Sequence, residues 1–216
     1  MSNIKAVLFD LDGTLIDSEF FYFSNWQPIL ERSFGLKIDF EDWIRYFAGH
    51  TLVHNVQFLQ AHWGIVTSEE YMWKETRASY EGADMKNIPL MPYAREILQE
   101  LKAANKRIAL VTSSYKKTVD TVLGHHDLLS YFEFFVTRES ITNPKPNPEP
   151  YLLGISLLGL EKADILVVED TFTGYSSAKA AELPCCVVSQ HPTERAKFAD
   201  EQSLYNGLDE VAKLLR

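Results

Sequence analysis

Short apolar runs alternate with longer segments of helical character along most of this chain. Four of the runs lack the polar alternation of a strand with one solvated face, which predicts parallel strands buried on both faces. These runs are Ala6–Phe9, Ile108–Val111, Ile165–Val168 and Cys185–Val188, and Phe132–Val136 is a weaker fifth. Helix-length segments such as Ala94–Ala104 and Pro148–Leu158 lie between several of them. The pattern predicts an α/β fold with a doubly wound parallel sheet.

Helix punctuation supports this reading at one connection in particular. Asn147 followed by Pro148 is typical of an N-cap with proline at the first helical position. We therefore expect a helix to begin there, shortly before the strand at Ile165–Val168.

One interval is too long for a simple crossover. About 95 residues separate Asp10 from Arg107, whereas parallel strands need a connection of only a dozen or more. Asp17 or Ser18 can cap a helix that runs towards Arg32. Thr67 with Glu70 forms a capping-box pattern before a further helical segment, Tyr71–Tyr80. We expect a helical domain at residues 17–86, inserted into a core that comprises residues 1–16 and 87–216.

Composition limits the class of protein. With 46% hydrophobic residues among 216, the chain can bury a sizeable core, and no apolar run approaches the roughly 18 residues of a membrane span. Asp10 and Asp12 interrupt the first apolar segment, so it does not resemble a secretory signal. The two cysteines, Cys185 and Cys186, are adjacent and poorly placed for a normal disulfide. We expect a reduced, cytoplasmic protein, with a monomer as the default state.

The net charge argues against extended polyanionic partners. A formal charge of −9, from 21 basic and 30 acidic residues, disfavours a broad nucleic-acid surface or an anionic-membrane surface, because both require clustered Lys and Arg. A small anionic ligand is still compatible with this charge. Any site for it must be local, built from a few donors and cations.

Polar side chains follow the predicted strands at the points where each strand ends. Because ligands bind outside the carboxyl ends of the strands in such sheets, these residues are the candidate site. Taken singly, each has an ordinary explanation as a turn, a helix cap or a surface charge. Their convergence at successive strand ends is what indicates a function. The set is Asp10, Asp12, Thr112, Ser113, Lys145, Glu169 and Asp170.

Phosphoryl transfer explains this set of residue types. A carboxylate that attacks a phosphoryl group faces like-charge repulsion, which a divalent cation between the two groups offsets. Mg²⁺ prefers oxygen ligands, usually one or two carboxylates together with a substrate phosphate. Asp10 and Asp170 suit that role, with Glu169 nearby and the backbone carbonyl of Asp12 as a further ligand.

The remaining residues can take complementary roles in the same reaction. Asp10 would form an aspartyl-phosphate, and Asp12 would protonate the leaving alcohol and later activate water. The Thr112 hydroxyl, the Ser113 backbone N–H and the Lys145 ammonium would hold the phosphate oxygens.

These residues resemble the four motifs of the haloacid dehalogenase superfamily. DLDGT is similar to the first motif, VTSS to the second, the lysine of KPNPE to the third, and VVED followed by Gly174 to the fourth. The resemblance implies a Rossmann-like core, a helical cap that closes over the site, and Mg²⁺-dependent aspartyl-phosphate chemistry. Within the superfamily the chain looks most like the branch of β-phosphoglucomutase and the small phosphatases of sugar phosphates and phosphoglycolate.

The second aspartate separates the possible chemistries of the superfamily. Haloacid dehalogenases lack an acid/base carboxylate at the position of Asp12, so the resemblance implies phosphoryl transfer. We expect a phosphatase of a small phosphorylated metabolite. A phosphomutase and a catalytically silent binding protein are the alternatives.

Several cap positions depart from the branch. Many relatives carry Gly-x-x-Arg in the cap, whereas Gly49 is followed by His-Thr-Leu, and Tyr22 stands where β-phosphoglucomutase has a histidine. Both differences weaken the phosphomutase alternative, and Tyr22 is itself a candidate substrate contact.

His50 and His54 would share a helix face, but the sequence offers no third metal ligand beside them. The helix after the fourth motif ends in Ala-Ala-Glu182 rather than Ala-Ala-Gly.

Overall fold

The computed structural model describes residues 4–189, 192–198 and 203–216. The chain divides into two compact units. One is continuous, Ser18–Ile88, and the other combines the chain up to Asp17 with Pro89–Arg216. We describe each unit by itself.

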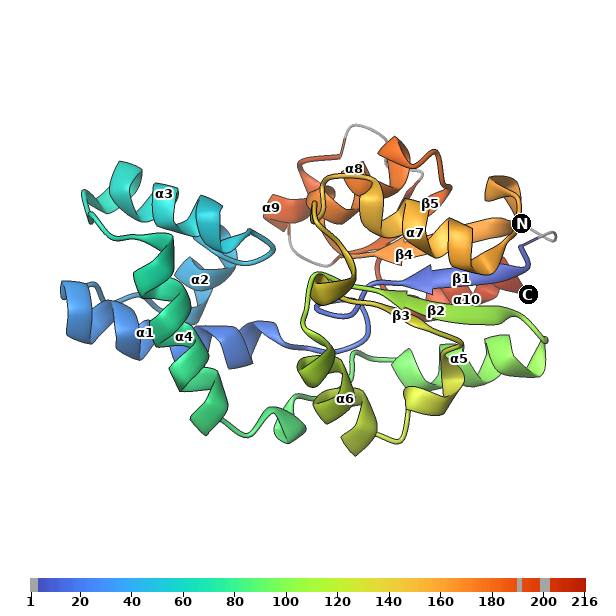
Figure 1. Ribbon diagram of the computed structural model, residues 1–216, viewed down its shortest axis with the longest axis horizontal. Coiled ribbons are helices and arrows are strands. Elements are labelled where there is room, and N and C mark those ends of the chain that lie inside the picture. Colours follow the sequence, from blue (N-terminus) through green and yellow to red (C-terminus); the bar gives the residue numbers. More distant parts are fainter. Residues whose placement is uncertain (1–3, 190–191, 199–202) are drawn as a thin grey trace. The chain divides into compact units, whose positions relative to one another are not determined.

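A single parallel sheet forms the centre of the discontinuous unit, with strand order β3-β2-β1-β4-β5-β6 (Figure 1). Its strands are β1 (Ala6–Phe9), β2 (Arg107–Val111), β3 (Phe135–Val136), β4 (Ile165–Glu169), β5 (Cys185–Val188) and β6 (Leu204–Tyr205). This confirms the doubly wound fold and its four strong strands. The weak fifth strand is shorter than predicted, because Phe132 ends a 3₁₀ turn. The edge strand β6 was missed, since it has only two half-buried residues.

The central strands are buried on both faces, as continuous apolar runs predict. Leu8 of β1 pairs with Ala109 of β2 and Val167 of β4, and β1 is completely buried. Helix α7 (Glu149–Leu158) packs closely on this centre, because Gly154 leaves room for the side chains of Leu8 and Val111. A Cβ atom at Gly154 would stand 3.2 Å from Leu8 Cδ1.

Helices cover both faces of the sheet, with α7 and α8 on one face and α5 and α10 on the other (Figure 1). The helices of this unit are α5 (Ala94–Ala103), α6 (Lys116–His125), α7, α8 (Phe172–Ala180), α9 (Pro192–Arg195) and α10 (Leu208–Leu215). The connections also contain the 3₁₀ turns η2 (Leu129–Tyr131), η3 (Arg138–Ser140) and η4 (Lys162–Asp164).

The start of α7 differs by one position from the prediction. The N-cap is Pro148 rather than Asn147. Asn147 still serves the helix start, because its Oδ1 accepts a hydrogen bond from the Glu149 backbone N–H at 2.9 Å.

The continuous unit is entirely helical. It contains α1 (Glu19–Phe34), α2 (Phe40–Tyr46), α3 (Leu52–Trp63), α4 (Glu69–Gly82) and the 3₁₀ turn η1 (Met85–Asn87). Its core is rich in aromatic rings: Phe47 stacks on both Trp43 and Trp63, at centroid distances of 5.4 and 5.8 Å. The unit therefore has a hydrophobic core of its own, separate from the one beside the sheet.

Two helix starts in this unit refine the sequence prediction. Ser18 is the N-cap of α1, although its side chain makes no capping hydrogen bond. The capping box of Thr67 and Glu70 is wrong, because Ser68 is the N-cap of α4 and its hydroxyl accepts the Tyr71 backbone N–H at 3.1 Å.

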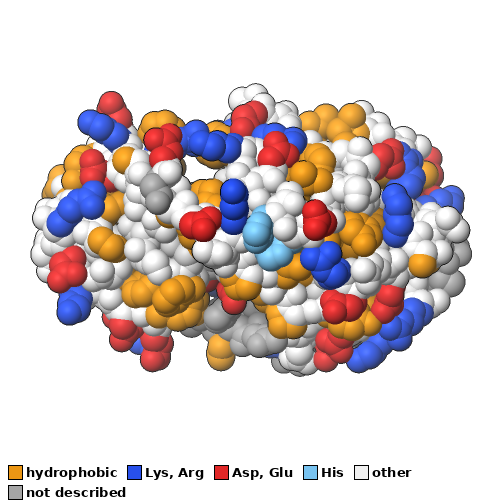
Figure 2. Space-filling view, turned by 90° about the horizontal axis from the view of Figure 1, so that it is seen from below, with side chains coloured by type: hydrophobic (Ala, Val, Ile, Leu, Met, Phe, Trp, Pro, Cys, Tyr) orange, Lys and Arg blue, Asp and Glu red, His pale blue; other side chains and the backbone are white. Residues whose placement is uncertain are grey.

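Across the described part of the chain, no helix combines the length and apolar character that a membrane crossing requires. Figure 2 shows acidic and basic side chains interspersed on one face of the molecule.

Candidate active site

The carboxyl ends of β1, β2 and β4 bring together residues that are far apart in the sequence. Asp10 follows β1, Glu169 ends β4 and Asp170 follows it. Lys145 arrives from the connection between β3 and α7. Its ammonium contacts both Asp10 and Glu169, so the strand-end segments predicted from the sequence do converge.

Lys145 occupies the centre of this group. Its Nζ donates to Asp10 Oδ1 at 2.6 Å, to Glu169 Oε1 at 2.5 Å and to the Val111 carbonyl at 2.8 Å. The side chain is only 6% exposed, so Lys145 is not a solvated surface lysine. Burial opposes the charged ammonium, but Asp10 and Glu169 outweigh it and hold the pKa of Lys145 above its ordinary value.

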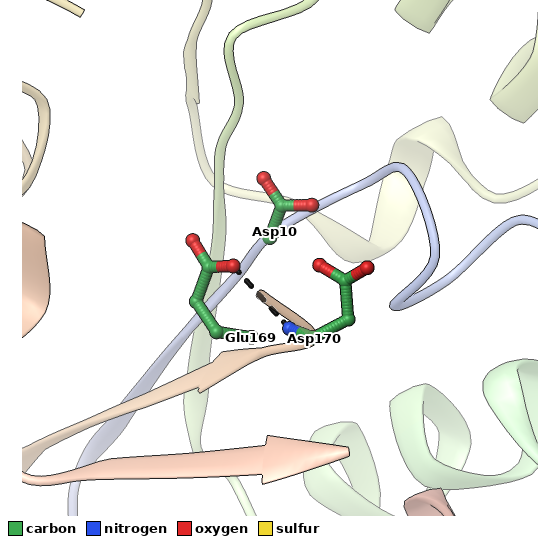
Figure 3. A group of neighbouring side chains, drawn as sticks. All are labelled: Asp10, Glu169 and Asp170. Atoms are coloured by element: carbon green, nitrogen blue, oxygen red, sulfur yellow. Dashed lines mark hydrogen bonds between the residues drawn. The ribbon is translucent and has the colours of Figure 1, made fainter. Parts of the chain in front are cut away.

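Asp10, Glu169 and Asp170 form a cluster of carboxylates (Figure 3). Each offers one oxygen, and these oxygens lie within 4.8 Å of one another. Burial raises the pKa of Asp10 to about 8; Glu169 and Asp12 add to this effect, and Lys145 opposes it. Lys145 contacts two of the three carboxyl groups, and the all-oxygen donor set of the cluster fits a hard divalent cation such as Mg²⁺.

Two glycines make space for the carboxylates. Gly13 has φ +75°, and a Cβ atom there would lie 2.1 Å from Asp170 Oδ2. At Gly174, in the first turn of α8, a Cβ atom would lie 2.0 Å from the carboxyl atoms of Glu169. Both carboxylates therefore sit directly against backbone that no side chain covers.

The segment after β2 supplies a contact to Asp12. The Ser114 hydroxyl donates to Asp12 Oδ2 at 2.6 Å, and the Ser114 backbone N–H donates to Thr112 Oγ1 at 3.0 Å. Thr112 is buried and Ser113 is exposed at this end of the strand. Hydrogen bonds thus join Asp12, Thr112 and Ser114 beside Val111, whose carbonyl accepts a hydrogen bond from Lys145.

Tyr22 belongs to the helical unit, in α1. Its ring contacts those of Phe21 and Tyr80, each at a centroid distance of 5.7 Å. In the same unit, the rings of His50 and His54 stack at 4.0 Å.

Sequence reasoning missed two side chains that contact the site. Ser114 lies inside the VTSS motif, but nothing in the motif identifies it as the partner of Asp12. Tyr151 lies in the first turn of α7, where it reads as an ordinary core position, yet its hydroxyl donates to Glu169 Oε1 at 2.6 Å. A tyrosine on an otherwise apolar helix shortly after Lys145 was the available signal.

A doubly wound parallel sheet with carboxylates after two adjacent strands, and a buried lysine between them, is an arrangement suited to chemistry on a phosphoryl group. The chain belongs to the haloacid dehalogenase-like hydrolase family, which it matches over residues 7–188.

Named relatives agree with this class. The chain is 31% identical over 178 residues to the phosphorylated carbohydrates phosphatase of Thermotoga maritima, covering 82% of each protein. It is 28% identical over 222 residues to hexitol phosphatase A of Escherichia coli, covering 96% of this chain and 93% of that protein. The solved structure of a haloacid dehalogenase superfamily hydrolase from Geobacter sulfurreducens is similar at a TM-score of 0.72 and 26% identity, over 100% of this chain and 98% of that one. The protein is a hydrolase of phosphate esters.

Proposed function

We propose that the protein is a Mg²⁺-dependent phosphatase that hydrolyses a small phosphorylated metabolite through an aspartyl-phosphate on Asp10. The observation that carries the proposal is the position of Asp10, 2.6 Å from the Lys145 ammonium and grouped with Glu169 and Asp170. A buried carboxylate beside a fixed cation is suited to nucleophilic attack on an anionic group.

The metal would be held by the carboxylates of Asp10 and Asp170 and by the backbone carbonyl of Asp12, with Glu169 beside them. When bound, Mg²⁺ would offset the repulsion between the nucleophile and the phosphate charge. Gly13 supports this assignment, because its bare backbone lets Asp170 approach the segment that contains Asp12.

Two carboxylates would divide the chemistry. A carboxylate oxygen of Asp10 attacks phosphorus; the P–O bond to the leaving group breaks, and Asp12 gives its proton to the departing alkoxide. Water then attacks phosphorus, Asp12 takes a proton from that water, and the bond to Asp10 breaks to release inorganic phosphate. The Ser114 hydroxyl holds Asp12 by its 2.6 Å hydrogen bond.

The cationic and neutral donors would bind the transferring oxygens. Lys145 supplies the positive charge. Two of its N–H groups can keep their hydrogen bonds to the Val111 carbonyl and to Glu169, while the third turns from Asp10 to a phosphate oxygen. The Thr112 hydroxyl and the Ser113 backbone N–H are the further candidates, at the adjacent end of β2.

The substrate class rests on the relatives and on the helical unit. Two relatives are named a phosphorylated carbohydrates phosphatase and a hexitol phosphatase, which supports a phosphorylated carbohydrate as the substrate here. We assign Ser18–Ile88 as the cap domain and Tyr22 as a candidate substrate contact within it. The net charge of −9 supports a small ligand rather than a nucleic acid.

The test of the mechanism is Asp10→Asn, assayed for phosphate release against a panel of phosphorylated sugars and related esters. Loss of the nucleophile should lower kcat at least roughly 10³-fold, while far-UV circular dichroism stays unchanged. Asp120→Asn, on the exposed face of α6, is the matched control and should retain full activity. Wild-type turnover by Asp10→Asn would reject the mechanism, and an isomerised product would identify a phosphomutase instead.

Removing the metal tests the proposed cofactor separately. Dialysis against a chelator should abolish phosphate release, and added Mg²⁺ should restore it because the carboxylates remain in place. Asp170→Asn should prevent this restoration at low millimolar Mg²⁺. Undiminished activity in the chelator-treated protein would contradict a Mg²⁺ requirement.

A further inference from the structure

Tyr151 contacts both charged partners of the Lys145–Glu169 pair. Its hydroxyl donates to Glu169 Oε1 at 2.6 Å, and the Lys145 ammonium lies 5.0 Å from the centre of its ring. The side chain is completely buried on α7. Burial raises the pKa of Tyr151 well above its ordinary value, so the hydroxyl keeps the proton that it donates.

The Glu169 carboxylate is restrained on several sides. Oε1 accepts hydrogen bonds from both Lys145 and Tyr151, and Oε2 accepts the Asp170 backbone N–H at 3.3 Å. Gly174 packs directly against the carboxyl atoms. Glu169 is 1% exposed, so protein donors take the place of water around its charge.

The hydroxyl also limits how strongly Glu169 competes for the lysine. The Lys145 ammonium donates one hydrogen bond each to Glu169, Asp10 and the Val111 carbonyl. If Tyr151 did not share Oε1, the less compensated charge of Glu169 would draw the ammonium away from Asp10.

We propose that Tyr151 is a positioning residue, whose hydroxyl shares Glu169 Oε1 with Lys145 and so directs the remaining Lys145 N–H towards Asp10. This inference rests on the proposed function to the extent that the same N–H then serves the phosphoryl group. The Tyr151 ring also makes a cation–π contact with the Lys145 ammonium, and the substitution Tyr151→Phe would preserve this contact.

Tyr151→Phe tests the inference because it removes the hydroxyl and keeps the ring. The affinity for inorganic phosphate, measured by calorimetry in the presence of Mg²⁺, should fall about 10-fold, because Glu169 loses a hydrogen bond to its charged carboxylate. We expect kcat to fall more than KM changes. Tyr131→Phe, at a half-buried position in η2, is the matched control and should leave phosphate affinity unchanged. Equal phosphate affinity in the two variants would overturn the inference.

A double-mutant cycle distinguishes positioning through Glu169 from a general loss of packing. If the hydroxyl acts through Glu169, then Tyr151→Phe should change phosphate affinity by less than 2-fold in a Glu169→Gln background. If the two losses multiply, the hydroxyl does not act through Glu169 and the proposal fails.

Proton exchange of the Lys145 ammonium can be measured in the unsubstituted protein, so this test does not depend on whether the variants fold. In ¹⁵N-labelled protein without substrate, the Lys145 ammonium should exchange its protons more slowly than the exposed ammonium of Lys213; Lys145→Met identifies the signal. Equally fast exchange would overturn the inference. This readout needs no turnover, so a protein inactive on every phosphate ester would reject the proposed function without deciding the role of Tyr151.

Discussion

Gly13 carries its backbone in the left-handed region, at φ +75°, directly against the Asp170 carboxylate. The position combines two requirements, because a side chain would be strained by the backbone and would also displace a candidate metal ligand. In the sequence alone, Asp12-Gly13 indicates only a common turn. The second requirement emerges only when β4 delivers Asp170 beside it.

Gly13→Ala separates the two requirements when it is compared with Gly35→Ala. Both positions have positive φ, at 75° and 66°, so each substitution should cost about 1 kcal/mol of stability. At Gly35 nothing lies within 4 Å of the added Cβ, whereas at Gly13 the Cβ would lie 2.1 Å from Asp170 Oδ2. We expect Mg²⁺ affinity, measured by calorimetry, to fall at least roughly 10-fold in Gly13→Ala alone. Equal Mg²⁺ affinity in the two variants would show that Asp170 does not hold the metal.

The residues of the site differ in how visible they were in the sequence. Asp10 could be placed because parallel strand ends share one edge of the sheet, and Lys145 because it lies in the connection that leaves this edge after β3. Tyr151 could not, since its role depends on which way one phenol points from a helix. Ser114 was adjacent to predicted residues, but its partner Asp12 is 102 positions away in the chain.

At the scale of elements, α8 ends in a Schellman motif with an unusual residue. The Glu182 N–H donates to the Lys179 carbonyl and the Leu183 N–H donates to the Ala178 carbonyl, at 2.9 and 3.0 Å. Glu182 has φ +62°, the conformation that glycine adopts most readily. The departure from Ala-Ala-Gly noted in the sequence therefore falls at a left-handed position.

Glu182→Gly should stabilise the protein by about 0.5–1 kcal/mol, because relief of left-handed strain exceeds the extra flexibility of glycine in the unfolded chain. The ion pair with Lys162, at 3.3 Å, is lost, but Glu182 is 79% exposed and such pairs contribute little. Urea unfolding measures the change. Glu182→Ala, which removes the side chain and keeps the strain, is the control. A higher midpoint for Ala than for Gly would contradict the strain argument.

The long apolar strands were predictable because burial on both faces leaves an uninterrupted pattern in the sequence. The two-residue strand β3 left only the weaker run Phe132–Val136, and β6 left no apolar run, since their pairing depends on neighbouring strands. The Thr67–Glu70 pattern was plausible, but Ser68 offers an equivalent hydroxyl one residue later. Local chemistry alone could not choose between the two starts.

At the scale of the whole molecule, two hydrophobic cores share no residue. The aromatic cluster around Phe47 belongs to Ser18–Ile88, while the carboxylate site belongs to the unit that contains the sheet. We therefore expect the stability of the helical unit to be independent of Mg²⁺ binding at the proposed metal site.

Phe47→Ala should destabilise the helical unit by about 3–5 kcal/mol, because Phe47 is 1% exposed and stacks on two tryptophans. Hydrogen exchange should accelerate in α2 and α3 but not in β1 or β4, and Mg²⁺ affinity should change less than 2-fold. Val66→Ala, at a position 80% exposed in the same unit, should leave exchange unchanged. Accelerated exchange in β1 would show that the two cores unfold together.

The chain leaves and re-enters the sheet-containing unit at points joined by backbone hydrogen bonds. The Asp17 N–H donates to the Pro89 carbonyl and the Met91 N–H donates to the Leu15 carbonyl, both at 2.9 Å. Because backbone hydrogen bonds join the two ends of the inserted segment, its length and fold need not change the position of Asp10. If Ser18–Ile88 is the cap domain that we propose, then an insert from another protein joined at this junction should change substrate preference and retain the chemistry at Asp10.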